Sequence, residues 1–174
     1  MSYNPSSIST NNIVNCHISQ NGAGAVTNAN GDYSGAAVYW EARPGAGVVW
    51  RIPRLLGGAR DATAFQINGY IAGGALANGV KIEIVRGTGA GATVLQTVEP
   101  AIKTWDIMGH NCYDLAFRQG SGAGEHFVHF RWTFSKAGVI FRLDGDQDDA
   151  FRITLNDDLR TLTGHNWHVQ GMVE

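Results

Sequence analysis

The 174-residue sequence is poor in charged residues, in basic patches and in long apolar runs, and each shortage excludes a class of protein. Charged residues make up 16% of the chain, below the roughly 25% that is usual for soluble domains. With a net charge of −2 and no basic stripe, we expect no nucleic-acid partner. No apolar run approaches the roughly 20 residues that span a bilayer, so we expect no membrane partner.

The chain has only two cysteines, which are far apart in sequence, and its first residues lack the basic and apolar parts of a signal peptide. We therefore expect Cys16 and Cys112 to be reduced and buried rather than bridged. Residues 1–12 are rich in Ser, Asn and Thr, which predicts a flexible N-terminal arm. Such an arm is either a frayed terminus or a segment that orders on a neighbouring subunit. Residues 13–174 are then expected to form a single domain.

Alternation of apolar and polar residues is present along most of the chain. It is clearest where Val128, Phe130, Trp132 and Phe134 alternate with polar side chains. A period of two is typical of a strand with one buried and one wet face. Further strands are predicted near residues 14–18, 38–41, 48–52, 65–71, 80–84, 94–98, 113–117, 139–143, 151–155 and 167.

Glycine and proline positions predict how these strands connect. The segment ARPGAG predicts a hairpin between the strands that carry Trp40 and Trp50, with both indoles on one face. Pro53 is expected to end the second strand or to confine it to a sheet edge, which leaves residues 55–62 as a loop. Residues 135–138 are expected to form a turn, and residues 87–92 a glycine-rich hairpin loop.

Many short strands separated by turns predict an all-β fold. We expect an antiparallel β-sandwich of the jelly-roll type, preceded by the arm. No stretch shows the sustained helical period of about 3.6 residues.

The acidic segment at residues 144–149 partly matches a calcium loop. Asp144, Asp146 and Asp148 occupy its first, third and fifth positions. The sixth position is Asp149 where glycine is required, and the twelfth is Leu155 where glutamate is required. We therefore interpret the segment as a solvated turn between two strands, with a looser calcium site as the alternative.

The histidines form two pairs at a spacing of three residues, His126 with His129 and His165 with His168. Residues three apart on a strand point to opposite faces, so neither pair predicts a metal site. The sequence thus gives no metal ligands and no cofactor site.

Other candidate chemistry is equally weak. His110, Asn111 and Cys112 are adjacent, whereas a nucleophilic site of these residue types is assembled from distant parts of a fold. The glycine-rich residues 87–92 lack the Lys-Ser/Thr that follows a phosphate loop. No pair of carboxylates stands out for glycoside hydrolysis. We therefore assign no catalytic residues and expect the chain not to be an enzyme.

Two tryptophans are candidates for a sugar-binding platform. Trp105 lies in a segment of uncertain structure and Trp167 in the short final strand. Aromatic side chains dominate protein cores and interfaces, so packing is the first interpretation and glycan stacking the alternative.

The C-terminal third carries a resemblance to a known class of protein. RWTF at 131–134, RLDG at 142–145, NDDL at 156–159 and HNWHVQG at 165–171 together resemble small virion structural proteins of tailed bacteriophages. The resemblance implies a β-sandwich protein without an active site, made in the host cytoplasm and incorporated into the virion.

Within the virion, the first expectation is a capsid decoration or cement protein on the outer head surface. A neck, tail or fibre-base component is an alternative, as is a carbohydrate-binding or receptor-binding module. The expected partners are other virion proteins, such as capsid or tail subunits, and further copies of the chain in a homo-oligomer.

Overall fold

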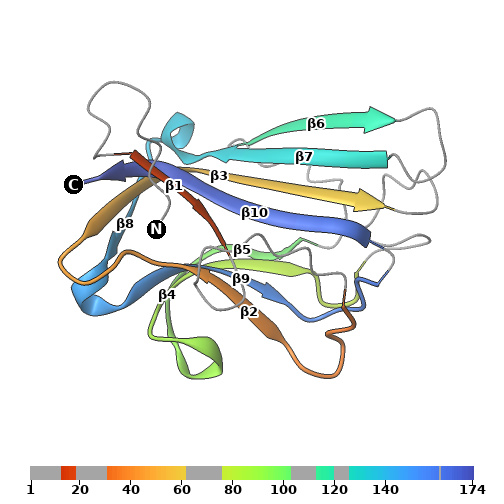
Figure 1. Ribbon diagram of the computed structural model, residues 1–174, viewed down its shortest axis with the longest axis horizontal. Helices are drawn as coiled ribbons and strands as arrows, with labels where there is room; N and C mark the ends of the chain where they lie inside the picture. The colour runs from red at the N-terminus through yellow and green to blue at the C-terminus, as the bar shows by residue number, and fades with distance from the viewer. Residues whose placement is uncertain (1–12, 19–30, 62–75, 103–112, 120–125, 161) are drawn as a thin grey trace.

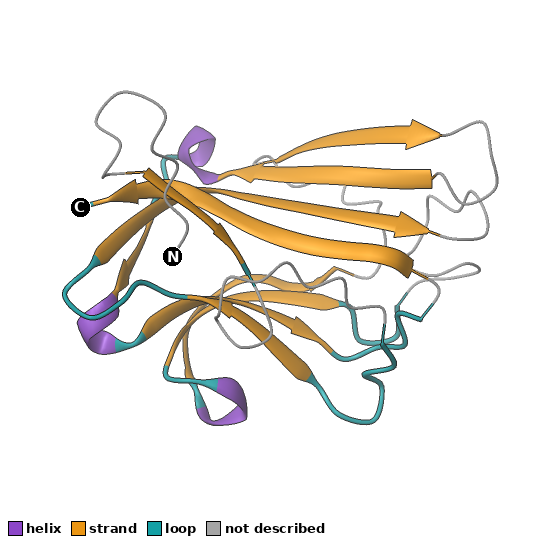
Figure 2. Ribbon diagram, viewed as in Figure 1, coloured by secondary structure: helices purple, strands orange, loops and turns teal. Residues whose placement is uncertain are grey.

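The computed structural model describes residues 13–18, 31–61, 76–102, 113–119, 126–160 and 162–174, and most of these residues lie in β-strands (Figure 1). The strands are β1 (Ile13–His17), β2 (Val38–Ala42), β3 (Val49–Asp61), β4 (Val80–Arg86), β5 (Thr93–Ile102), β6 (Tyr113–Gln119), β7 (His126–Thr133), β8 (Phe141–Asp144), β9 (Asp149–Leu155) and β10 (Leu162–Val173). Figure 2 shows that helix is confined to short turns between strands: η2 (Gly89–Gly91), η3 (Phe134–Ala137) and η4 (Gly145–Gln147). The expected all-β class is confirmed.

The strands form two antiparallel sheets, which lie one above the other in Figure 1. The six-stranded sheet has the order β1-β10-β3-β7-β6, and β8 also pairs with β3. The four-stranded sheet has the order β2-β9-β4-β5. Strands β1 to β4 alternate between the two sheets along the chain, so neither sheet is built from one continuous stretch of sequence.

The prediction of a hairpin between β2 and β3 is wrong, because these strands belong to different sheets. β2 pairs with β9, and β3 pairs with β7, β8 and β10. Trp40 and Trp50 are both 0% exposed, one contributed by each sheet. The connection crosses between the sheets because this brings the two indoles into the core from opposite sides.

Pro53 lies inside the 13-residue strand β3, where a strand end or sheet edge was expected. On one side, the β7 pairing stops at Arg54 and the β8 pairing starts at Ile52, so Pro53 faces a junction. On the other side, a register shift sets Ile52 and Pro53 against Gly171. Because both neighbours skip this position, the missing proline N–H costs no ladder hydrogen bond. The prediction of a loop at 55–62 is wrong for residues 55–61, which belong to β3; residue 62 lies outside the described ranges.

The turn expected at 135–138 is present but does not reverse the chain. The 3-10 helix η3 ends at Ala137 and is capped by Gly138, whose φ of 74° is left-handed. β7 and β8 then follow one another along the same neighbour, β3. Phe141 and Leu143 of β8 are buried as the alternation predicts, whereas Val139 is 38% exposed and lies before the strand.

One hydrophobic core lies between the sheets and takes side chains from both. Its largest fully buried members are Trp40, Trp50, Trp132, Trp167 and Phe151. The Trp132 and Trp167 rings lie 5.8 Å apart at 31°. The Phe134 and Phe141 rings meet edge to face at 4.8 Å. The cluster confirms the buried alternation of β1, β4, β8 and β9, and shows that Trp167 packs in the core.

Several expectations concern residues outside the described ranges. They are the arm at 1–12, the strand near 65–71, Trp105 and the adjacent residues 110–112.

Removing the indole of Trp132 should lower the free energy of unfolding by about 3–5 kcal/mol, because a large ring packed against Trp167 is replaced by a cavity. Chemical denaturation of Trp132→Ala, followed by far-UV circular dichroism, measures the change. Val139→Ala, at an exposed position, is the control and should change stability by less than about 0.5 kcal/mol. A loss below about 1 kcal/mol for Trp132→Ala would contradict its place in the core.

Candidate functional site

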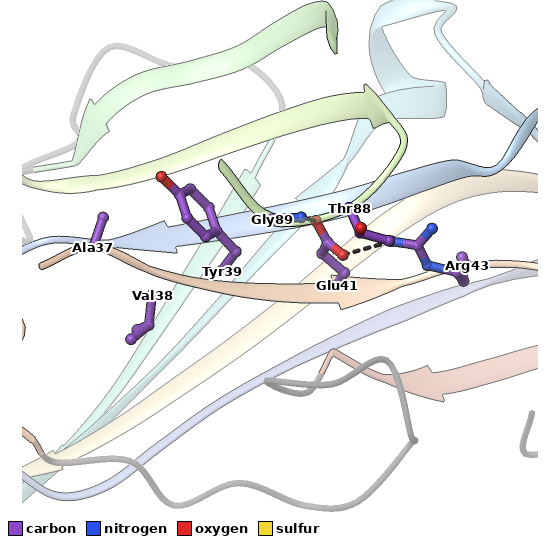
Figure 3. A pocket seen from close by; sticks show the side chains of 7 residues that line it. All are labelled: Ala37, Val38, Tyr39, Glu41, Arg43, Thr88 and Gly89. Atoms are coloured by element: carbon purple, nitrogen blue, oxygen red, sulfur yellow. Dashed lines mark hydrogen bonds and ion pairs between the residues drawn. The ribbon is translucent and has the colours of Figure 1, made fainter. Parts of the chain in front are cut away.

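A hollow of about 450 Å³ lies beside β2 and the tip of the β4–β5 hairpin, on the face of the four-stranded sheet away from the core (Figure 3). It is lined by Ala37, Val38, Tyr39, Glu41, Arg43, Thr88 and Gly89. Its volume falls within the range of about 300–1,000 Å³ that is usual for small-ligand sites. This hollow is the candidate functional site.

Strand alternation explains how β2 supplies the floor of the hollow. Trp40 and Ala42 point into the core and are at most 1% exposed. Tyr39, Glu41 and Arg43 therefore point the other way, toward the hairpin tip, as Figure 3 shows. The next strand, β9, places Arg152 directly opposite Glu41.

The first ion pair beneath the hairpin tip joins β9 to β4. The Arg152 guanidinium donates to Glu83 Oε2 through Nε at 3.2 Å and through Nη2 at 2.8 Å. Both side chains are buried, with exposed fractions of 6% and 7%. Arg152 Nη1 also donates to the Gly89 carbonyl oxygen at 2.9 Å, which ties the hairpin tip to the sheet.

The second set of contacts joins β2 to the same hairpin tip. The Glu41 carboxylate accepts from Arg43 and, at 3.2 Å, from the Gly89 backbone N–H. Arg43 also donates to the Gly87 carbonyl oxygen at 3.3 Å and pairs with Asp148. Gly89 has a φ of 57°, a left-handed conformation that favours glycine at this clamped position.

Tyr39 is the aromatic member of the hollow. The Arg152 guanidinium carbon lies 5.0 Å from the centre of its ring, within the range of a cation–π contact. Tyr39 is half-buried, so part of the ring stays open to a ligand. Around it, each carboxylate faces an arginine, so the hollow combines an aromatic surface with balanced charge and suits a neutral polar molecule.

The acidic segment at 144–149 is a turn, as interpreted from the sequence, and it crosses from β8 in one sheet to β9 in the other. Its carboxylates bind protein groups: Asp144 accepts from Asp146 N at 3.0 Å, and Asp146 from Gly47 N at 2.7 Å. Asp148 pairs with Arg43, and Asp149 with Arg86 at 2.9 Å. Across the described ranges, no three His, Cys, Asp or Glu side chains gather in a way that could hold a metal ion.

The two aspartates after β9, Asp157 and Asp158, bind neighbouring backbone and side-chain groups. Asp157 is buried and accepts from the backbone N–H groups of Asn78 and Gly79 at 2.9 and 2.8 Å. Asp158 is bound by the Arg160 guanidinium, which lowers the pKa of Asp158 to about 2. These contacts fix the entry to β4 and the exit from β9.

The remaining candidate residues are dispersed. His126 and His129 lie on β7, and His165 and His168 lie on β10. Cys16 is buried, as expected, and burial raises the pKa of its thiol. Residues 87–92 form the expected hairpin loop. The sequence did not predict that this loop covers the buried pair of Arg152 and Glu83.

Comparison with protein families, with curated proteins and with solved structures finds no match to this chain. Among the described residues there is no helix of the length and apolarity needed to cross a membrane.

The sequence did not single out the residues of the hollow. The sequence does place charged residues at the outward positions of three predicted strands: Glu41, which lines the hollow, and Glu83 and Arg152, which pair beneath the hairpin tip. A strand that is wet on its outer face gives the same pattern. Only the pairing of β2 and β4 with β9 brings these charges together.

Replacing Arg152 by methionine should destabilise the fold by about 3–5 kcal/mol, because Glu83 would be left buried without its partner. Removing the carboxylate as well, in Arg152→Met/Glu83→Leu, should recover most of that loss. The exposed pair of Arg160 and Asp158 provides the control, since Arg160→Met should cost less than about 1 kcal/mol. Equal losses of unfolding free energy for Arg152→Met and Arg160→Met in chemical denaturation would contradict a structural role for the buried pair of Arg152 and Glu83.

Proposed function

We propose that the chain is a non-enzymatic structural component of a bacteriophage virion, with a head decoration or cement protein as the first assignment. A neck, tail or fibre-base component is the alternative within the same class. The proposal also includes a flexible arm at residues 1–12, self-association and binding to other virion proteins. Three properties of the chain support it: its strand order, the role of the residues that carry the resemblance, and its low charge.

The strand order is the observation that carries the proposal. In a jelly roll of about eight strands, the first, eighth, third and sixth strands form one sheet, and the second, seventh, fourth and fifth form the other. Here the sheet orders are β1-β10-β3-β7 and β2-β9-β4-β5. The two series agree when β7 and β8 are counted as one interrupted strand and β6 as an addition at the edge. Jelly rolls are used by viral capsid proteins and by lectins.

The residues that carry the phage resemblance have packing roles, which supports a structural rather than a catalytic function. Trp132, Leu143, Leu159 and Trp167 are each at most 2% exposed. A Cβ on Gly171 would lie 2.0 Å from the Arg51 carbonyl oxygen, so glycine is required where β10 approaches β3.

A virion role predicts that gradient-purified particles of the phage that encodes the chain contain it in many copies, measured by quantitative mass spectrometry. When added to particles that lack the protein, the purified chain should co-sediment with them. A variant without residues 1–12 should fold but bind more weakly, because an arm adds contacts only once it orders. Particles that contain no copy of the chain would refute the virion role, and equal binding of the variant would refute the arm.

Carbohydrate binding is the second candidate, and the hollow at Tyr39 favours it. A half-buried aromatic ring next to Glu41 and Arg43 offers a stacking surface and hydrogen-bonding groups with balanced charge. Trp167, the candidate for sugar stacking named from the sequence that the structure describes, is buried and offers no exposed ring.

Glycan binding at this hollow should be lost in Tyr39→Ala and kept in Tyr39→Phe, because phenylalanine preserves the ring. A glycan array followed by calorimetric titration of the strongest hit measures both. An array without hits for the wild-type chain, or a hit that Tyr39→Ala binds equally well, would contradict this second candidate.

A further inference from the structure

The edge strand β5 has an exposed stretch without charge. Within the described strands, β5 pairs with β4 alone and closes one side of the four-stranded sheet. Thr93 to Thr97 are all exposed, and no charged residue occurs between Arg86 and Glu99. Natural sheets usually protect such an edge with charged side chains, proline or bulges, because unpaired N–H and C=O groups attract another strand. In β5 the charge and the proline, Glu99 and Pro100, lie toward the other end of the strand, outside this stretch.

Two neighbouring apolar side chains stand out on this edge. Val94 is 44% exposed and Leu95 is 46% exposed. On β4, Val85 pairs with Val94 and Ile84 pairs with Gln96, so Leu95 has no partner and forms a bulge. A bulge re-aims side chains, so the two-residue alternation of β5 is interrupted at Leu95.

The other described edge strands lack this combination. β1 and β2 have five residues each. β2 carries Glu41, and β6 carries the charged residues Asp114 and Arg118. β8, which among the described strands pairs with β3 alone, has four residues and carries Arg142 and Asp144. Among the edge strands whose side chains are described, β5 is therefore the one that combines a neutral stretch with two adjacent exposed apolar side chains.

We propose that two copies of this chain associate through β5, antiparallel and edge to edge about a two-fold axis, with Leu95 near that axis. The neutral stretch supports a second copy as the occupant, because identical strands meet there without like charges opposite one another. Two-fold contacts are self-complementary, and Val94 and Leu95 of one copy would cover those of the other. A partner recognised by charge would find no charge on this stretch to bind.

This inference rests on the proposed function as an assembly protein and names the surface through which copies meet. The four-stranded sheets of the two copies would join into one continuous sheet. The particle experiment above reads a different property, so a chain that is monomeric yet abundant in virions would overturn β5 pairing and leave the virion role intact.

Light scattering coupled to size exclusion, over a concentration series of the full chain, tests the proposal. We expect a dimer or a larger even-numbered assembly for the wild type. Leu95→Lys should weaken its self-association about tenfold or more, because a lysine enters the buried centre of the contact. Ile140→Lys is the matched control, since Ile140 is 48% exposed and precedes β8 in the other sheet. Circular dichroism checks that both variants are folded.

Mixing Leu95→Lys with Leu95→Glu tests the two-fold arrangement itself, because opposite charges across the axis should restore a mixed dimer. A wild type that stays monomeric would overturn the proposal. So would a Leu95→Lys variant that associates like the wild type, an Ile140→Lys variant that dissociates equally, or a charge-swapped mixture that remains monomeric.

Discussion

The structure depends on one constraint: two sheets share a single hydrophobic core. Trp40 enters it from the four-stranded sheet, while Trp50, Trp132 and Trp167 enter it from the six-stranded sheet. Each sheet buries its apolar face against the other, and because β1 to β4 alternate between the sheets, both sheets draw on the same stretch of chain. Burial of large aromatic side chains is the dominant favourable term in such a core. The turns, bulges and ion pairs described above position the strands so that the two sheets can pack around this core.

The connections between the sheets carry the polar groups that hold them in position. The crossing from β8 to β9 uses Asp146 and Asp148 to bind the segment that joins β2 to β3. A Cβ on Gly145 would lie 1.9 Å from the Gly45 carbonyl oxygen, so the two crossings touch through their backbones. The acidic turn is thus explained by its protein partners, and its carboxylates are used where the chain changes sheet.

The outer surface divides into two kinds of region. Around the hollow, the arginines and carboxylates neutralise one another, and the hairpin tip at Gly89 covers the ion pair of Arg152 and Glu83. Along residues 93–97 of β5, by contrast, no charge is present and Val94 and Leu95 are open to solvent. A surface of this kind is suited to contact with protein, in agreement with the low overall charge and with the proposed role in an assembly.

Local sequence determined which residues form strands and which face of each strand is buried, because alternation with a period of two acts over a few neighbouring residues. The buried faces of β1, β4 and β9, the turn at 144–149 and the burial of Cys16 were all predictable on that basis. Tertiary structure alone decided which strands pair. It separated β2 from β3, carried β3 past Pro53 where both neighbours skip that position, and brought Glu41, Glu83 and Arg152 together. Pairing and register are non-local: they depend on how both sheets fill one core, which no short stretch of sequence specifies.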